Sequence, residues 1–322
     1  MTVHATKDPT ATAEREIVIG VVMMAGTAMV LQPGMDTVTK YLGGQIPPLQ
    51  VAWARMFFQM LFTLPIVMAW YGLPGLAPRP YGLQILRGLF LSATVVTFTF
   101  AVTLMPLADA IALVFVAPLI VTALSAIVLR EAVGPRRWTA VVVGLVGAMI
   151  IIRPGSGLFG AAALLPIVAA VCYACYLIVT RRLTTHSPPI STHFFTAVVG
   201  TAALSVPLAI GLLIGGPVIT PSAPTAVQWG LLVIIGIIAS ISHLVIIFAY
   251  SRSPASMLAP LTYLEIVGAS AFGYLVFGDF PDGWTWVGVV VIVASGLYVV
   301  LRARRIKTAL PPDIQGPRTG TI

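Results

Sequence analysis

The second half of this chain repeats its first half at a constant offset. Shifting residues 88–143 by 148 positions places them on residues 236–291. Identical residues then coincide along the stretch: Gly88 with Gly236, Pro106 with Pro254, Leu113 with Leu261, and Trp138 with Trp286. Each half contains five long apolar segments, and because five is odd, the second copy must enter a bilayer from the opposite face. Inverted repeats around a midplane site are typical of secondary transporters.

The composition places the chain in a membrane. Hydrophobic residues make up 58% of the 322 residues and charged residues only 9%, whereas soluble domains carry about 25% charged residues. A helix needs about 20 apolar residues to cross a hydrocarbon core of ~30 Å, and the apolar segments reach this length. The predicted fold is therefore an all-α polytopic membrane protein embedded in the lipid bilayer, with ten transmembrane helices arranged as two inverted five-helix repeats.

Ten spans follow from the hydropathy pattern. They are expected at about residues 17–39, 48–70, 83–104, 106–129, 137–152, 158–180, 191–214, 227–250, 254–277 and 284–301. The first repeat then covers residues 17–152 and the second covers residues 158–302. The polar stretches 1–16 and 303–322 are expected to be cytoplasmic tails without fixed structure. The joints between spans are short, so everything that the protein does must happen inside the helical bundle.

Lysine and arginine residues lie almost entirely on one side of the predicted spans. If the N-terminus is cytoplasmic, fifteen of the 18 basic residues face the cytoplasm, Arg87 among them. Lys40 and Arg153 face the outside, and Arg55 lies within a span. The positive-inside rule therefore predicts that both termini are cytoplasmic. The net charge of +8 follows from this topology, so no nucleic-acid partner is expected.

Charged residues inside the predicted spans are functional candidates, because a charge in hydrocarbon is costly. Asp36 lies in the outer part of the first span and Arg55 in the outer part of the second. Counted at 1.5 Å per residue from the turn between the spans, the depths of the two residues agree within ~3 Å. Two interpretations remain open: a structural ion pair that neutralises both charges, or a site that binds substrate or acts as a gate.

A second candidate pair is His243 in the eighth span and Glu265 in the ninth. Glu265 is expected near mid-membrane, with His243 within about one helical turn of that depth. An intramembrane glutamate and histidine at neighbouring depth are candidates for relaying or coupling protons. The alternative is a neutral glutamic acid that is hydrogen-bonded to a neighbouring helix. Capping and interfacial hydration explain the acidic residues at expected helix ends: Asp109, Glu131, Asp279 and Asp282.

Aromatic and proline residues within the spans mark further candidates. Tyr173, Tyr176 and Tyr263 can stack on a planar ligand or simply pack in the bundle, and both interpretations stay open. Pro118 and Pro260 interrupt the fourth span of each half. A proline frees backbone carbonyls and bends a helix, and in transporters such breaks often mark the central site.

Sequence motifs for catalysis and cofactor binding are missing. The chain has no G-x-x-x-x-G-K-[ST] loop for ATP, no H-E-x-x-H and no G-x-S-x-G. Cys172 and Cys175 lie in an apolar span without the further ligands that a zinc site needs. We therefore expect no catalytic residues, no metal and no cofactor.

Motifs at the ends of several spans resemble the EamA type of the drug/metabolite transporter superfamily. The first is MDTVTKYL, residues 35–42, followed by Trp53-Ala54-Arg55. The others include PLADAIAL at residues 106–113 and LAPLTY at residues 258–263. The resemblance covers about residues 17–302, and its most similar branch includes riboflavin and S-adenosylmethionine uptake transporters. It implies a central cavity lined mainly by helices 1, 3, 4, 6, 8 and 9.

The repeat and the resemblance together imply a secondary active transporter of the bacterial inner membrane. We expect it to move a small polar or zwitterionic metabolite by alternating access, either coupled to protons or as an exchanger. The candidate substrate-binding or gating residues are Asp36, Arg55, Tyr173, Tyr176, His243, Tyr263 and Glu265. The alternative is a membrane-embedded enzyme or assembly factor on the same scaffold. The even spread of small residues indicates no dimer face, which leaves a monomer or a weak homodimer.

Overall fold

The computed structural model describes residues 9–128, 134–153, 160–183, 187–216, 219–253 and 255–309, and within these ranges the regular structure is entirely helical. The α-helices are α1 (Pro9–Gly26), α2 (Gln32–Gly43), α3 (Pro48–Tyr71), α4 (Tyr81–Leu104), α5 (Leu107–Val114), α6 (Ala117–Val128), α7 (Pro135–Ile152), α8 (Leu164–Leu183), α9 (Pro189–Ile214), α10 (Ala226–Arg252), α11 (Ala255–Leu258), α12 (Leu264–Phe277) and α13 (Gly283–Ala309). The π-helical turn is η1 (Thr27–Leu31), and the 3-10 turns are η2 (Leu73–Leu76), η3 (Gly160–Ala163) and η4 (Ala259–Tyr263).

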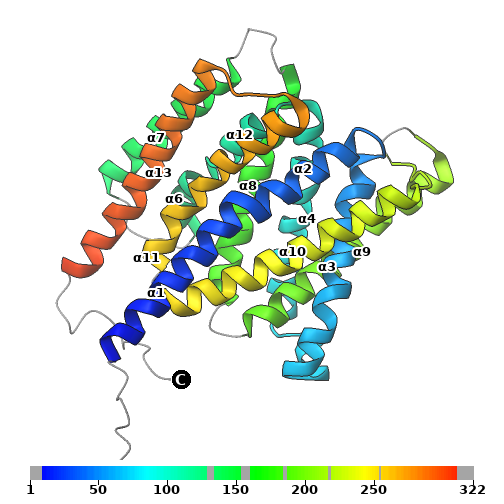
Figure 1. The fold of residues 1–322 in the computed structure, drawn as a ribbon, viewed down its shortest axis with the longest axis horizontal. Helices are drawn as coiled ribbons and strands as arrows, with labels where there is room; N and C mark the ends of the chain where they lie inside the picture. The colour runs from blue at the N-terminus through cyan, green and yellow to red at the C-terminus, as the bar shows by residue number, and fades with distance from the viewer. Residues whose placement is uncertain are drawn as a thin grey trace, which may run out of the picture.

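The helices form a polytopic membrane bundle. Eight helical segments in the described residues are long and apolar enough to cross a membrane. Two shorter apolar helices, Trp138–Ile152 in α7 and Gly283–Tyr298 in α13, correspond to the fifth and tenth expected spans. The start of α1 and the end of α13 lie at the same end of the bundle in Figure 1, as an even number of crossings requires. The prediction of an all-α polytopic membrane protein is confirmed.

The first helix begins earlier than the sequence indicates. Residues 9–16, expected in a tail, form the start of α1. Glu16 forms an ion pair with Arg252 at the end of α10 (Oε2 to Nε, 3.0 Å), and the Ser253 hydroxyl donates to the Ile17 carbonyl (2.9 Å). These contacts hold the start of α1 against another helix, which hydropathy alone does not reveal. At the other end, α13 continues to Ala309.

Several expectations fall on residues outside the described ranges. These are the outermost tail segments, 1–8 and 310–322, and the turn containing Arg130 and Glu131.

Two spans in corresponding positions of the two halves are broken. The fourth span divides at Phe115-Val116 into α5 and α6, and Pro118 is the second residue of α6. The ninth span divides into α11, η4 and α12, and Pro260 is the second residue of η4. A proline cannot donate the helical hydrogen bond and clashes with the preceding turn. The two breaks meet, because the rings of Phe115 and Tyr263 lie 5.1 Å apart.

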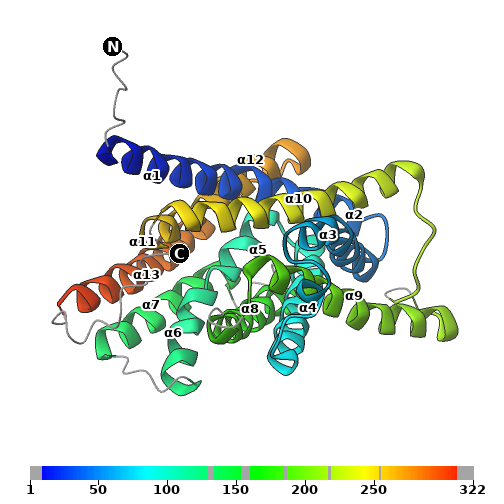
Figure 2. The ribbon, with the colours of Figure 1, turned by 90° about the horizontal axis from the view of Figure 1, so that it is seen from below.

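Helices of one half pack mainly on helices of the other, and the contacts come in related pairs. The contact of α4 with α8 has its counterpart in α10 with α1, that of α4 with α9 in α10 with α3, and that of α6 with α8 in α12 with α2. The contacts of α3 with α9 and of α7 with α13 map onto themselves when the halves are exchanged. Figures 1 and 2 show α7 running beside α13 at one flank and α3 beside α9 at the other.

Close approach of α7 and α13 depends on glycine. A β-carbon on Gly147 would lie 3.0 Å from the Gly288 carbonyl oxygen, and one on Gly288 would lie 2.7 Å from the Gly147 carbonyl oxygen. The second distance is shorter than β-carbons show, and the β-carbon on Gly147 would also lie 2.9 Å from the Ile292 side chain, so both positions favour glycine at this close contact of the helices. Small residues at helix interfaces are the usual way in which membrane helices pack tightly.

Hydroxyl groups along the spans are mostly satisfied within their own helices. The Thr37 hydroxyl donates to the Pro33 carbonyl (2.7 Å), Thr63 to Gln59 (2.7 Å) and Thr180 to Tyr176 (2.7 Å). The same bond to the residue four positions earlier is made by Thr27, Thr39, Ser92, Thr94, Thr97, Thr122, Thr196, Thr201, Ser205, Ser240 and Ser270. Such bonds satisfy the hydroxyl within its own helix. Four of these hydroxyls also bond to a second helix: Thr180, Thr196, Ser205 and Ser240.

Candidate functional site

Three charged residues from three helices form the centre of the candidate site. Asp36 is buried on α2, Arg55 lies on α3, and Glu265 lies in the first turn of α12. Arg55 interacts electrostatically with both carboxylates, and the two carboxylates interact with each other. The structure therefore places Glu265, predicted to pair with His243, beside Asp36 and Arg55.

Local backbone features place these charges. The π-helical turn η1 precedes α2, and such an insertion rotates the helix that follows it, a feature frequent at functional sites. Gly268 on α12 packs against this turn, since a β-carbon there would collide with the Met29 carbonyl oxygen and come within 2.7 Å of Pro33. The glycine lets α12 approach α2 closely, which brings Glu265 near Asp36.

The central charges interact without direct pairing. Within the part of the chain that the structure describes, no salt bridge joins Arg55 to Asp36 or Glu265. The Arg55 Nε is buried and has no hydrogen-bond partner. Buried polar atoms are normally hydrogen-bonded, so an unpartnered one calls for an explanation such as a ligand or a water molecule. Arg55 thus has hydrogen-bonding capacity left for a third group.

Two tyrosines on α8 lie next to this centre. The rings of Tyr173 and Tyr176 are stacked, with centroids 5.6 Å apart and planes inclined by 17°. Tyr173 is partly exposed and interacts electrostatically with Arg55 and Glu265. Tyr176 is 5% exposed and lies on the side of the stack that contacts Arg87.

Arg87 on α4 occupies an unexpected position. The sequence counts it among the cytoplasm-facing arginines, but its side chain is only 3% exposed. It donates to the Tyr176 hydroxyl (2.5 Å), the Thr180 hydroxyl (2.8 Å) and the Thr192 carbonyl (3.1 Å), and also to the Thr196 hydroxyl. Its partners lie on α8 and α9, helices of the other half, so no local sequence pattern points to this contact.

His243 stacks on a histidine that sequence reasoning did not single out. The rings of His243 on α10 and His193 on α9 lie 3.5 Å apart and nearly parallel, at 11°. Both ring nitrogens of His193 are buried without a hydrogen-bond partner. No hydrogen bond joins His243 to Glu265 among the described residues. The position of His193 four residues after Pro189, at a helix start, gave no sign of its burial.

Tyr263 lies with the helix breaks. Its ring is near Phe115, and its hydroxyl is buried without a partner. A β-carbon on Gly296 of α13 would collide with this hydroxyl, so the glycine provides the space that Tyr263 occupies. Tyr263 therefore contacts α13 and the fourth span.

Two ion pairs lie at the face of the bundle opposite the start of α1. Lys40 at the end of α2 pairs with Asp279 (Nζ to Oδ2, 2.6 Å), and Arg153 at the end of α7 pairs with Asp282 (2.7 Å). Lys40 and Arg153 are the two basic residues expected outside. Both aspartates belong to the segment between α12 and α13, so each pair joins the first half to the second.

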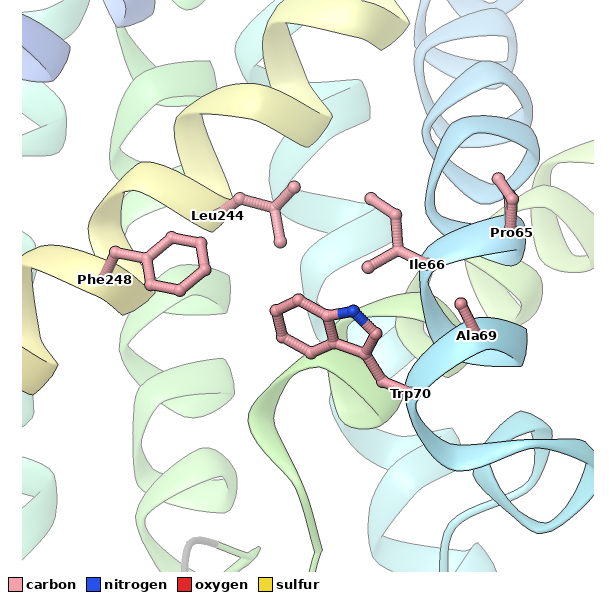
Figure 3. A pocket seen from close by; sticks show the side chains of 6 residues that line it. All are labelled: Pro65, Ile66, Ala69, Trp70, Leu244 and Phe248. Atoms are coloured by element: carbon pink, nitrogen blue, oxygen red, sulfur yellow. The ribbon is translucent and has the colours of Figure 1, made fainter.

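A groove on the surface between α3 and α10 is separate from these polar groups. It has a volume of about 360 Å³ and is lined by Pro65, Ile66, Ala69, Trp70, Leu244 and Phe248 (Figure 3). Figure 3 shows the side chains of Trp70, Leu244 and Phe248 pointing into it. All six are apolar, so the groove offers packing and no charge recognition. Elsewhere in the described residues, no cluster of three or more His, Cys, Asp or Glu side chains has the arrangement of a metal site.

Comparison with known proteins assigns the family. The EamA-like transporter family matches residues 17–153 and again residues 160–301. The chain belongs to the EamA-like transporter family. The double match falls on the two halves that the offset of 148 positions relates. Members of this family are transporters, so the alternative of a membrane enzyme on the same scaffold is not retained.

The matches to curated relatives cover most of both chains. An S-adenosylmethionine uptake transporter of Rickettsia prowazekii is 30% identical over 271 residues, which cover 84% of this chain and 88% of that protein. A riboflavin transporter of Brucella anthropi is 28% identical over 268 residues, covering 83% and 93%. One crystal structure superposes with a TM-score of 0.58 at 18% identity, over 92% of this chain and 99% of the other. This last likeness concerns the fold alone.

Proposed function

We propose that this member of the family is a secondary transporter that moves a small zwitterionic metabolite across the cytoplasmic membrane by alternating access. The proposal is carried by Arg55, which interacts with both Asp36 and Glu265 but pairs directly with neither. A substrate with a carboxylate and an ammonium group would complete this arrangement, because its carboxylate can accept from the guanidinium and its cationic groups can face the two carboxylates.

The first substrate to test is S-adenosylmethionine. It carries one carboxylate and two positive groups, an ammonium and a sulfonium, which match one arginine and two carboxylates. A relative at 30% identity is named as an uptake transporter of this compound. Riboflavin, named for another relative, is uncharged and would leave all three central charges without partners.

The relation between the halves supports the proposal of alternating access. The pairs of helix contacts that exchange when the halves are exchanged support an inverted repeat. In this arrangement, a motion of one half that opens one face has an equivalent motion of the other half that opens the opposite face. The broken spans that meet at Phe115 and Tyr263 supply helix segments that can move separately.

The orientation proposed for the chain has both termini in the cytoplasm. It rests on the distribution of the basic residues. A cysteine introduced at Asp282 should react with an impermeant thiol reagent added to intact cells, and one at Arg136 should not. Cys172 and Cys175, both free thiols, would first be replaced by serine. The reverse labelling pattern would show that the orientation is wrong.

Reconstituted transport tests the function directly. Purified protein in liposomes should take up radiolabelled S-adenosylmethionine above protein-free liposomes, and unlabelled substrate should compete. The variant D36N should lose most of this uptake while remaining folded, whereas a matched acidic variant at the bundle end, E16Q, should retain it. Absence of uptake and of exchange for this compound and for other zwitterions would reject the proposal.

A further inference from the structure

A pair of tyrosines beside the central charges has the form of a stacking platform. Tyr173 is partly exposed, and Tyr176 lies behind it, nearly parallel, with a centroid distance of 5.6 Å. Tyr173 interacts electrostatically with Arg55 and Glu265, so the outer member of the stack lies near the central charges. Parallel aromatic rings are favourable neighbours for a further planar ring.

Tyr176, the buried member of the stack, is held by Arg87 at both its hydroxyl and its ring face. Arg87 donates to the Tyr176 hydroxyl at 2.5 Å, and its guanidinium carbon lies 4.4 Å from the centroid of the Tyr176 ring. Arg87 is in turn fixed by Thr180, Thr192 and Thr196. The ring of Tyr176 therefore cannot rotate without breaking contacts to α4.

The partners of Arg87 are unusual for a buried cation. All are hydroxyl or carbonyl oxygens, and no carboxylate pairs with Arg87 within the described residues. A buried charge without a counter-ion is costly. A role beyond packing would account for an arginine in this position, where an apolar residue would stabilise the interface more simply.

We propose that Arg87 is a positioning residue, which holds the Tyr173–Tyr176 stack as a subsite for the planar heteroaromatic ring of the substrate. This inference rests on the proposed function, because it places the ring of the same molecule whose charged groups bind at Arg55, Asp36 and Glu265. The expected substrate class is a zwitterion that carries a purine or a similar ring.

Two ligands separate the ring subsite from the charged site. S-adenosylmethionine carries the sulfonium zwitterion and an adenine ring, whereas S-methylmethionine carries the same zwitterion without the ring. Binding of both would be measured on purified protein by competition against radiolabelled S-adenosylmethionine. We expect the unmodified protein to bind S-adenosylmethionine about tenfold more tightly, the value of one stacked base.

Four substitutions test the platform. Tyr173→Leu removes the outer ring and should abolish the preference for the adenine-bearing ligand, whereas Tyr173→Phe keeps the ring and should preserve it. Arg87→Lys keeps the charge but loses the planar arrangement of donors. It should weaken the binding of S-adenosylmethionine several-fold and leave the binding of S-methylmethionine nearly unchanged. Tyr176→Phe removes only the hydroxyl that Arg87 contacts and should give a smaller loss of the same kind. Arg252→Lys, at the far end of α10, is the matched control.

The outcomes are distinguishable. Equal losses for both ligands in Arg87→Lys and Tyr173→Leu would mean that these residues only support the fold, and would overturn the ring subsite while leaving the proposed function intact. An unmodified protein with no preference between the ligands would overturn it as well. If neither sulfonium compound binds, the zwitterion proposal fails. The binding of riboflavin, which has a planar ring, and of ribitol, which has none, is then compared in the same variants. If Tyr173→Leu has the same ratio of the two affinities as the unmodified protein, the ring subsite is again overturned.

Discussion

Lys40 and Asp279 form an ion pair, 2.6 Å from Nζ to Oδ2, that joins the end of α2 to the segment after α12. The same ammonium group donates to the Met105 carbonyl at the end of α4 (3.2 Å) and lies 4.6 Å from the centre of the Phe277 ring. Lys40 therefore connects three segments from both halves at one face of the bundle. The proposed alternating access requires this face to open, which predicts that the pair breaks during the transport cycle.

Cross-linking Lys40 to Asp279 should stop transport. In a background that lacks Cys172 and Cys175, the variant K40C/D279C would be treated with a short bifunctional methanethiosulfonate reagent. We expect uptake into proteoliposomes to fall to background and to return after reduction, because the reagent fixes a contact that has to separate. The single variants K40C and D279C, treated in the same way, should keep their activity. Full transport by the cross-linked protein would show that this face does not open.

Asp36 and Arg55 should be energetically coupled even without direct contact. Neutralising one of them leaves the other charge in a low-dielectric interior, so the double variant D36N/R55Q should lose less stability than the sum of the single variants. For residues in one electrostatic network, we expect a coupling of about 0.5–3 kcal/mol. Thermal unfolding of the four proteins in detergent gives this number. Strictly additive losses would mean that the two charges act independently.

Glu265 should determine the response of transport to pH. It is a carboxylate within a span, and such groups are the usual carriers of protons in transporters. If it exchanges protons during the cycle, Glu265→Gln should leave the protein folded but flatten the dependence of flux on pH between about 5 and 8. Glu16→Gln, at the end of the bundle, should keep the wild-type profile. A variant Glu265→Gln with unchanged rate and profile would limit this residue to helix packing.

Asp282 should stabilise the protein most above acidic pH. The Thr285 backbone N–H, and beside it Arg153, lower the pKa of Asp282 below its usual value of 3.8. The carboxylate therefore stabilises the folded state fully above pH 3.8, and this contribution is lost as the pH falls through the lowered pKa. Since the side chain is 47% exposed, the main effect is that of a helix cap, about 1 kcal/mol.

Unfolding curves at several pH values check this contribution of Asp282. Asp282→Ala should be less stable than the wild type at pH 7, and the difference should shrink in acid. Asp282→Asn keeps an oxygen that can accept from the Thr285 N–H and loses only the charge, so its stability should lie between those of the wild type and Asp282→Ala. A stability difference that does not change with pH would show that the charge contributes nothing.

Most of the fold could be predicted from the sequence, because length and hydropathy determine membrane spans directly. The ten expected spans correspond to eight long and two shorter apolar helices. The breaks lie close to Pro118 and Pro260, since proline acts locally on the backbone. The extension of α1 to Pro9 could not be predicted, because these residues are polar and hydropathy does not show the contact of Glu16 with Arg252 on another helix.

The candidate site could be predicted only in part. Asp36, Arg55 and Glu265 stand out because charges are rare in spans, and depth along a helix can be counted. Their arrangement around Arg55 depends on the helix rotation set by η1 and on the close approach of Gly268. Arg87 and His193 were missed because each lies near a helix start, where polar residues are common, and their partners come from distant parts of the chain.

The serine and threonine hydroxyls of the bundle have a mechanical consequence. At least fourteen of them donate to carbonyls of their own helices. Four of these hydroxyls also bond to a second helix, namely Thr180, Thr196, Ser205 and Ser240, and the others add no hydrogen bond between helices in the described part of the chain. When one helix slides past another, a hydroxyl that bonds only within its own helix travels with that helix, and its hydrogen bond does not have to break. Resistance to movement is then concentrated in a few polar joints, such as Arg87 with α8 and α9, around which the remaining helices can shift.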